Sequence, residues 1–383
     1  MIYRTLAISV IALAASFGFA NWSTFHGNNQ RTGRASVAGP AQPRIIWACD
    51  LNGPMISSPI LANDGTIYII NQAETLVPKN YLNAINPNGT IKWRYELPWI
   101  DDLSMATPAV GPDGRIYGGT ATGFFFCVSP SGQLVWSIQA NKAVNNHTLV
   151  TADGSIYTVL DEKFTSIRPD GTIRWQYPLD ADYIGGPTEG LDGTLYIFGY
   201  GGLRAYTPAG TLKWTAFVNF TMAPPAIAPN GDVIAFGSAC QALDPLDGSM
   251  RWANYISADG TYGTPAIDAA GNVYHGSDYK LFKVTNTGAT AMTGYLEVPG
   301  SNLLGHTWSS AIVDSSGKVY LGLGNGKRSA IPFEKNLMVL NSNMVRTYLT
   351  PLPEIAGTAV PALGDDGRLY VGCLDGKLYC LGN

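Results

Sequence analysis

The hexapeptide NDGTIY, Asn63 to Tyr68, decides the fold because variants of it recur along the chain. The other copies are PDGRIY, ADGSIY, LDGTLY, PNGDVI, AAGNVY, SSGKVY and DDGRLY, with turn glycines Gly114, Gly154, Gly193, Gly231, Gly271, Gly317 and Gly367. Asp-Gly and Asn-Gly supply the positive φ that a tight hairpin needs, and the apolar residues that follow suit a strand. A spacing of roughly 40 residues is typical of architectures that repeat one small structural unit.

Two further marks accompany the turns. Six residues before the glycine, most copies have a proline: Pro59, Pro108, Pro187, Pro225, Pro265 and Pro361, with Thr148 and Ala311 in the other two. Proline cannot donate to a sheet ladder, so the first strand of each copy should be an edge strand. After the turn, a hairpin such as INPNGTIKW (Ile85–Trp93) ends in tryptophan in most copies. We therefore expect four strands per copy, A to D, and a propeller whose A strands line a central channel.

The last copy of the repeat lacks a strand that the N-terminal part of the chain can supply. The last copy stops after its third strand, KLYCLG (Lys377–Gly382), so one D strand is missing there. The stretch Arg44–Asp50 carries the Ile and Trp of a D strand and has no copy of its own. We therefore predict an all-β, eight-bladed β-propeller with four antiparallel strands per blade, closed by this N-terminal strand. The propeller should span residues 44–383 as one domain.

The first 43 residues precede the predicted propeller and divide into a leader, residues 1–20, and an N-terminal extension, residues 21–43. Residues 1–20, MIYRTLAISVIALAASFGFA, combine Arg4, a short apolar run and a small-x-small site, which is the pattern of a secretory signal peptide cut before Asn21. The mature protein is then exported, periplasmic or extracellular, and no other stretch is apolar enough to span a membrane. Residues 21–43 should pack on the propeller through Trp22 and Phe25, with His26, Asn28 and Asn29 as hydrogen-bonding staples.

Charge and cysteine usage exclude several classes. The net charge is −4 and there is no basic run, so a nucleic-acid partner is not expected, and we predict a monomer. Five widely spaced cysteines (Cys49, Cys127, Cys240, Cys373 and Cys380) do not form a disulfide framework. Cys127 and Cys380 fall where other C strands have small residues, which indicates packing. A disulfide from Cys49 to Cys373 or Cys380 stays open.

A family resemblance rests on the hairpins. ALDPLDGSMRW, Ala242 to Trp252, resembles the tryptophan-docking motif of PQQ-like (quinoprotein-type) propellers, and TPAVGPDGRIYGG, Thr107 to Gly119, resembles the PQQ-like repeat. The resemblance implies structural docking roles for Trp47, Trp93, Trp136, Trp175, Trp214 and Trp252. The family includes quinone-dependent dehydrogenases and also non-catalytic periplasmic scaffolds, such as the eight-bladed lipoprotein of the outer-membrane β-barrel assembly machine.

The resemblance also says what an enzyme of this family would need. Its dehydrogenases use a vicinal Cys-Cys pair and calcium-binding side chains, often with an attached haem domain. This sequence has no adjacent cysteines and no C-x-x-C-H motif, and its four histidines lack metal-ligand spacing. We therefore assign no catalytic, cofactor-binding or metal-binding residue and expect no cofactor. PQQ with calcium is the alternative, in a PQQ-dependent oxidoreductase.

The two faces of the predicted ring differ. The A–B and C–D turns are short and alike and form what we call the turn face. The B–C and D–A connections vary and form the loop face, where recognition is usually built. Candidate binding residues on the loop face are Trp99, Asp101, Asp102, His147, Tyr183, Phe220, Tyr262, His306 and Trp308. We predict a non-catalytic exported binding or scaffold protein that uses this face for a protein partner, with glycan binding as a further alternative.

Overall fold

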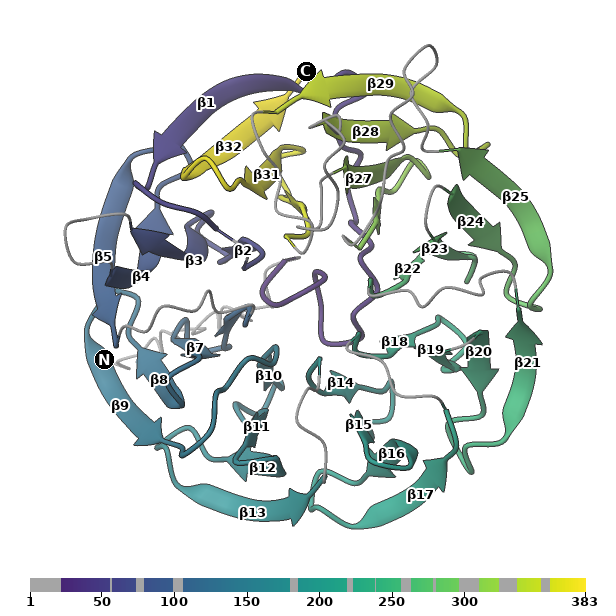
Figure 1. The fold of residues 1–383 in the computed structure, drawn as a ribbon, viewed down its shortest axis with the longest axis horizontal. Coiled ribbons are helices and arrows are strands. Elements are labelled where there is room, and N and C mark those ends of the chain that lie inside the picture. The colour runs from purple at the N-terminus through teal and green to yellow at the C-terminus, as the bar shows by residue number, and fades with distance from the viewer. Residues whose placement is uncertain are drawn as a thin grey trace, which may run out of the picture.

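The computed structural model describes residues 22–55, 57–73, 79–98, 106–179, 185–218, 223–237, 239–255, 263–277, 280–295, 310–323, 336–352 and 359–383. These residues form eight four-stranded antiparallel sheets arranged as a ring around a central channel (Figure 1). The predicted eight-bladed propeller is therefore confirmed.

Within blades one to seven the strands run outward from the channel in chain order. Blades one to four are β2 (Ile60–Leu61), β3 (Ile67–Ala73), β4 (Lys79–Ile85), β5 (Ile91–Leu97); β6 (Ala109–Val110), β7 (Ile116–Gly119), β8 (Phe124–Val128), β9 (Leu134–Gln139); β10 (Leu149–Val150), β11 (Ile156–Leu160), β12 (Lys163–Ile167), β13 (Ile173–Pro178); and β14 (Thr188–Glu189), β15 (Leu195–Gly199), β16 (Gly202–Tyr206), β17 (Leu212–Ala216). Blades five to seven are β18 (Ala226–Ile227), β19 (Val233–Phe236), β20 (Cys240–Leu243), β21 (Met250–Asn254); β22 (Ala266–Ile267), β23 (Val273–Ser277), β24 (Lys280–Val284), β25 (Thr290–Tyr295); and β26 (Ile312–Val313), β27 (Val319–Leu323), β28 (Asn336–Leu340), β29 (Arg346–Pro351).

Blade eight joins the two ends of the chain, as predicted. It contains β30 (Ala362–Leu363), β31 (Leu369–Gly372) and β32 (Lys377–Gly382), and its outer strand is β1 (Arg44–Asp50). The β1–β32 ladder is antiparallel and runs from Arg44 opposite Gly382 to Asp50 opposite Lys377, with a bulge between Ile45 and Trp47. Figure 1 shows β1 and β32 side by side although they are the first and last strands of the chain.

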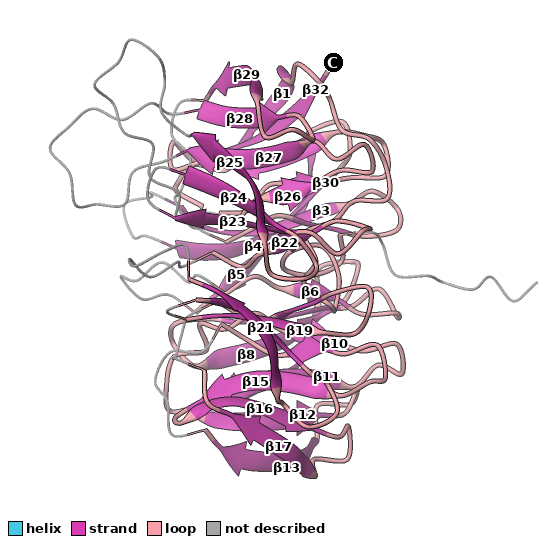
Figure 2. Ribbon diagram, turned by 90° about the vertical axis from the view of Figure 1, so that its right-hand side faces the viewer, coloured by secondary structure: helices cyan, strands magenta, loops and turns pink. Residues whose placement is uncertain are grey.

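In the repeated turns a side-chain oxygen, that of an aspartate in most copies and of Asn230 in blade five, accepts a backbone N–H. At the first copy, the Asp64 carboxylate accepts the Thr66 N–H at 2.9 Å, and Ala62 and Thr66 pair through their backbones at 2.9 Å. Gly65 takes the φ of +77° that this turn requires. Because the turn is tight, it leaves the A and B strands in register. The ring seen edge-on in Figure 2 carries such turns on its right-hand side.

Tryptophans join neighbouring blades at the rim. The Trp93 ring lies against Gly132 of the next blade, where a Cβ would come within 2.7 Å of it, and its Nε1–H donates to the Pro130 carbonyl at 2.9 Å. The same Nε1 bond runs from Trp47 to Pro87, Trp136 to Pro169, Trp175 to Pro208, Trp214 to Pro245 and Trp252 to Asn286. Met292 and Tyr348 hold this position at the seams between blades six and seven and between blades seven and eight.

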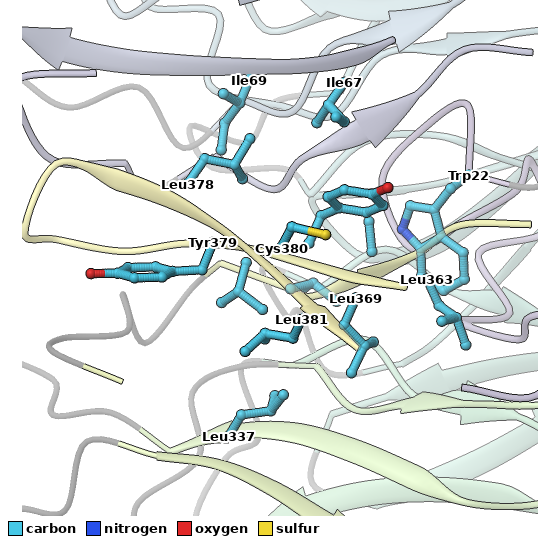
Figure 3. Close-up of a cluster of buried hydrophobic side chains, with 14 of the residues drawn as sticks. Trp22, Ile67, Ile69, Leu337, Leu363, Leu369, Leu378, Tyr379, Cys380 and Leu381 are labelled. Carbon is cyan, nitrogen blue, oxygen red and sulfur yellow. The ribbon is translucent and has the colours of Figure 1, made fainter. Parts of the chain in front are cut away.

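The buried apolar residues form clusters between and within the blades. The largest cluster gathers where the chain ends meet and includes Trp22, Ile67, Leu337, Leu369 and Cys380 (Figure 3). It therefore draws side chains from blades one, seven and eight and from the segment before β1. Ring closure rests on this shared core as well as on the β1–β32 ladder.

Candidate functional site

Residues 22–35, which we call the hub, lie inside the central channel (Figure 1). Hub carbonyls accept hydrogen bonds from the second residue of the A strand in six blades. These bonds join Leu61 to Trp22, Val110 to Ser23, Glu189 to Asn29, Ile227 to Gln30, Ile267 to Thr32 and Val313 to Gly33, at 2.8–3.0 Å. The inner edges of these sheets are therefore paired with the hub.

Arg31 anchors the hub between blades three and four. Its side chain is fully buried, and its Nη1 donates to Thr24 Oγ1 at 2.6 Å and to the Phe25 carbonyl at 2.9 Å. Its Nη2 donates to the carbonyls of Thr148 and Pro187, both at 3.1 Å. None of these acceptors is a carboxylate, and burial lowers the pKa of Arg31 to about 9. The buried cation is held by neutral oxygens that come from the hub and from two blades.

His26 is the second polar anchor of the hub. Its Nδ1 lies 2.7 Å from the Arg31 carbonyl and its Nε2 lies 2.8 Å from the Ala311 carbonyl at the start of blade seven. Two carbonyl partners favour a doubly protonated ring, but burial outweighs them and lowers the pKa of His26 to about 4. His26 is therefore neutral at physiological pH. Asn29 adds bonds from its Nδ2 to the Val150 carbonyl and to Glu189 Oε2, at 2.9 and 2.8 Å.

His147 is the candidate loop-face residue that the structure describes. It lies at the start of blade three, and its ring stacks on Phe25 with centroids 3.6 Å apart and planes 4° apart. Its Nδ1 accepts the Thr107 N–H at 3.2 Å, and its own N–H donates to the Gly185 carbonyl at 3.1 Å. Burial, Arg31 and His26 hold the pKa of His147 well below its usual value. The side chain is a neutral link between blades two and three, and Phe25 covers its face.

The bond from Thr107 to His147 belongs to a series around the channel. In four blades, the residue two places before the A strand uses its N–H to reach the side chain at the same position in the next blade. Val360 donates to Ser58 Oγ at 3.0 Å, Ser58 to Thr107 Oγ1 at 3.2 Å and Thr264 to Ser310 Oγ at 2.8 Å. His147 thus takes the place that serine or threonine has in other copies, as the acceptor of a structural hydrogen bond from the preceding blade.

The remaining candidates of the loop face fall outside the described residues. They are Trp99, Asp101, Asp102, Tyr183, Phe220, Tyr262, His306 and Trp308. Their use in binding stays a prediction.

The described part of the loop face carries three strongly exposed aromatic side chains that the sequence analysis did not select. Tyr200, in the β15–β16 turn, is 77% exposed, Phe217, after β17, is 83% exposed, and Tyr255, after β21, is 73% exposed. A Cβ on Gly202 of the Tyr200 turn would meet the Ala216 carbonyl, so this turn lies beside the segment that leads into Phe217. The three side chains belong to the neighbouring blades four and five.

The sequence did contain a signal for two of them. Phe217 and Tyr255 each stand three residues after a docking tryptophan, where the D strand leaves the rim. The other tryptophan-bearing D strands have Asp50, Glu96, Gln139 and Pro178 at that position. An aromatic side chain there is therefore not needed by the repeat, and it marks blades four and five as different from the others.

The fold raises the question of whether the channel could hold pyrroloquinoline quinone, a planar tricarboxylate. The hub occupies the inner edges of the blades, and both of its arginines are bonded to protein oxygens: Arg31 through its two Nη groups, and Arg34 from Nη1 to the Asp268 carbonyl at 3.1 Å. The sequence offers no pair of adjacent cysteines, and the described residues contain no group of three His, Cys, Asp or Glu side chains placed to hold a metal ion. The described residues do not fit this cofactor.

The cysteine thiols are structural. All five are free and buried, so the open question of a Cys49 disulfide is answered by a free thiol at that position. Burial raises the pKa of Cys127 and of Cys380 to about 12, which keeps both thiols protonated and unreactive.

Among the described residues, no helix is long and apolar enough to cross a membrane.

Comparison with known proteins places this architecture. A family model described as outer membrane protein assembly factor BamB matches residues 78–279, which is more than half of the chain. Quinohemoprotein alcohol dehydrogenase from Comamonas testosteroni superposes with a TM-score of 0.71 at 13% identity, covering 96% of this chain and 82% of that one. BamB from Moraxella catarrhalis superposes with a TM-score of 0.68 at 14% identity, covering 89% of this chain and 100% of that one. No curated protein sequence matches the chain. At these identities the structural likeness concerns the fold.

Proposed function

The chain belongs to the PQQ-like propeller family whose model is described as outer membrane protein assembly factor BamB, and from this premise we propose that it is an exported, non-catalytic scaffold that binds a protein partner. Binding takes place on the loop face, in the periplasm or outside the cell, and needs no cofactor. The protein acts as a monomer.

The observation that carries this proposal is the group formed by Tyr200, Phe217 and Tyr255. Each side chain is at least 73% exposed, and all three lie on the loop face over blades four and five. Aromatic side chains that become buried in the centre of an interface are among the commonest hot spots, since they bury a large area at a small cost in side-chain entropy. The partner that fits these three side chains best is a protein surface with pockets in which they become buried.

The test compares the loop face with the turn face in one experiment. The mature protein is first used to capture a partner from the native cell envelope, and the partner is identified and purified. Its affinity for the parent protein and for each variant is then measured by titration. Alanine at Tyr200, Phe217 or Tyr255 should weaken binding by about 1–4 kcal/mol at one or two of the positions. The matched controls are Leu191→Ala and Leu246→Ala, which truncate exposed apolar side chains in turn-face turns and should bind normally.

The outcomes separate the alternatives. Normal binding by all three aromatic variants, together with loss of binding on the turn-face charge reversals Arg115→Glu or Arg368→Glu, would show that the wrong face has been assigned. Trp99→Ala, Tyr183→Ala, Tyr262→Ala and Trp308→Ala extend the test to the other loops. Retention on a polysaccharide resin that these aromatic variants lose would favour a glycan ligand. Tight binding of PQQ with calcium and turnover of an alcohol or sugar would overturn the scaffold proposal.

A further inference from the structure

The seam between blades five and six lacks a hydrogen bond that other seams have at the loop-face end of the channel. In four blades the residue two places before the A strand donates its N–H to the side chain at that position in the next blade. Blade five has Pro224 at this position, and proline has no N–H to donate. The side chain that would accept the bond is Thr264 of blade six, which is buried and whose Oγ1 has no partner among the described residues. This end of the seam is therefore joined less well than the seams that have the bond.

The core of the same seam contains a histidine without a partner. His275, in β23, is 4% exposed, and its ring centroid lies 4.8 Å from that of Phe236 in blade five and 5.4 Å from that of Phe282 in blade six. Neither ring nitrogen has a hydrogen-bond partner in the described part of the chain. The repeat does not need an imidazole here, since the same B-strand position is uncharged in the other copies: Ile69, Gly118, Thr158, Ile197, Ala235, Leu321 and Val371. A buried polar group without a partner costs free energy, so even the neutral ring weakens this seam.

The surroundings of His275 offer no anion to a protonated ring. The side chains packed in this layer come from β18 to β22 and from β24, and they are mainly apolar: Ala226, Ile234, Phe236, Cys240, Trp252, Ile267 and Phe282. The titratable groups on this side are Cys240, whose pKa is raised by burial so that the thiol stays neutral, and the exposed cation Lys280, two residues before Phe282 on β24. Burial without an opposing carboxylate lowers the pKa of His275 to about 4. The closed seam therefore excludes the imidazolium.

We propose that the loop-face half of the seam between blades five and six is an acid-operated switch, in which protonation of His275 drives its ring into water and away from Phe236. The missing bond at Pro224 makes this the end of the seam that yields. The two blades remain joined elsewhere. Hub carbonyls hold Ile227 and Ile267 at the turn-face end, and Trp252 Nε1 donates to the Asn286 carbonyl at the rim at 3.0 Å. The opening is therefore local and reversible.

The switch acts on the blade that carries part of the proposed binding surface. Phe236 ends the B strand of blade five at the loop face, and Tyr255 follows the D strand of the same blade. A partner that fits the loop face of the closed ring binds better while His275 is neutral, so acid lowers its affinity. This consequence rests on the proposed function, whereas the opening itself does not.

Backbone amide hydrogen exchange on the whole propeller with its hub, from pH 7 to pH 4.5, tests the opening. A water-exposed imidazole has a pKa of about 6.5, so the open seam takes up a proton that the closed seam excludes. The stability of the closed seam is therefore complete above about pH 6.5 and falls as the pH approaches 4. After correction for the intrinsic exchange rate, the opening constant for amides of β19, β23 and β24 should rise about tenfold per pH unit below pH 6.5, and about 30-fold between pH 7 and pH 5.

Two substitutions of His275 separate titration from packing. His275→Leu introduces the residue that blade seven has at this position, and His275→Gln keeps a polar group that does not titrate. Both should remove the acid-induced rise in β19, β23 and β24, while the acid response of the hub is kept. A rise of the parental size in either variant, or a parental rise that is equal in all blades, would overturn the switch.

A third variant tests the missing bond. Pro224→Ala supplies the N–H that Thr264 lacks, and it should lower the opening constant about fivefold at every pH without changing the slope. An unchanged opening constant would overturn the role assigned to Pro224. None of these exchange measurements needs a partner. Their failure would therefore overturn the switch alone, and normal binding by the aromatic variants would overturn the proposed function alone.

Discussion

Residues 22–35 and residues 44–50 both hold the blades of the ring together, but they do so with different chemistry. The hub works from inside the channel through carbonyl oxygens, the buried cation of Arg31 and the neutral ring of His26. The rim, by which we mean the outer strands of the blades with residues 44–50 among them, lies on the outside of the ring. It is held by the β1–β32 ladder and by tryptophans that lie flat on glycines of the next blade. The hub depends on polar groups in register and contains titratable side chains. The outer contacts depend mainly on apolar contact area. The two can therefore be broken separately.

Removing the hub should have the largest effect. A chain that starts at residue 42 keeps β1 but loses Trp22, Phe25 and the bonds to six A strands. Two buried aromatic side chains and six hydrogen bonds together amount to a loss on the order of 5 kcal/mol or more. Thermal melting against the chain that starts at Asn21 measures it. If the two chains melted at the same temperature, β1 alone would close the ring and the comparison would fail.

Breaking one rim contact should cost somewhat less. In Trp214→Ala, the ring that packs on Gly248 and donates to the Pro245 carbonyl is removed, which leaves a cavity between blades four and five. We expect a loss of about 3–5 kcal/mol in the free energy of unfolding, measured by denaturant titration. Met292→Ala truncates the residue at the same position in a seam without tryptophan and should cost clearly less. Equal losses would mean that the tryptophan seams are not special.

Acid should weaken the hub and spare the rim. The pKa of His26 is lowered to about 4 from an ordinary value near 6.5, because burial disfavours the imidazolium. The unfolded chain therefore takes up the proton more readily than the fold does, so stability is complete above about pH 6.5 and falls between pH 6.5 and pH 4. His26 alone accounts for about 3 kcal/mol, and His147 acts in the same direction. Tm measured from pH 7 to pH 4 tests this, and a flat profile would contradict it.

His275 offers the smallest and most specific check, because it belongs to neither closure. Its ring lies between Phe236 and Phe282, both of its nitrogens are buried without a hydrogen-bond partner among the described residues, and burial lowers its pKa to about 4. His275→Leu should therefore stabilise the protein by about 1 kcal/mol at pH 7 and reduce the acid loss. A destabilised variant would mean that the imidazole forms a contact outside the described residues. The hub variants should retain their own pH dependence in this background.

The repeat made the architecture predictable from the sequence. The eight turn glycines, the prolines before the A strands and the split last blade specify strand order, blade number and closure, and all three agree with the structure. These features are local, since each depends on a turn or a ladder within one copy. The path of the hub is not local. Its bonds go to A strands spread over most of the chain, and no spacing in residues 22–35 indicates which blade each carbonyl meets.

The candidate site was predictable only in part. His147 was selected for its place at the channel, and its role as a hydrogen-bond link to Thr107 could be seen only once Phe25 was found stacked on it. Phe217 and Tyr255 break the pattern of the D strands, so comparison between the copies would have found them. The exposure of Tyr200 could not be read from the sequence, because a tyrosine in a Gly-rich turn packs inward as readily as outward.

The hub also sets the order in which the molecule can fold. His26 bonds a carbonyl 285 residues further along the chain, and the Pro43 carbonyl accepts a bond from Thr350, 307 residues away. The residues that are synthesised first therefore find their last partners only when blade seven has been made. Contacts of such long range form late and slowly, because the loop between them must close first. Each blade can assemble as it is synthesised, but the N-terminal end stays without its partners until the whole chain is available. The ring is thus completed in a single late step.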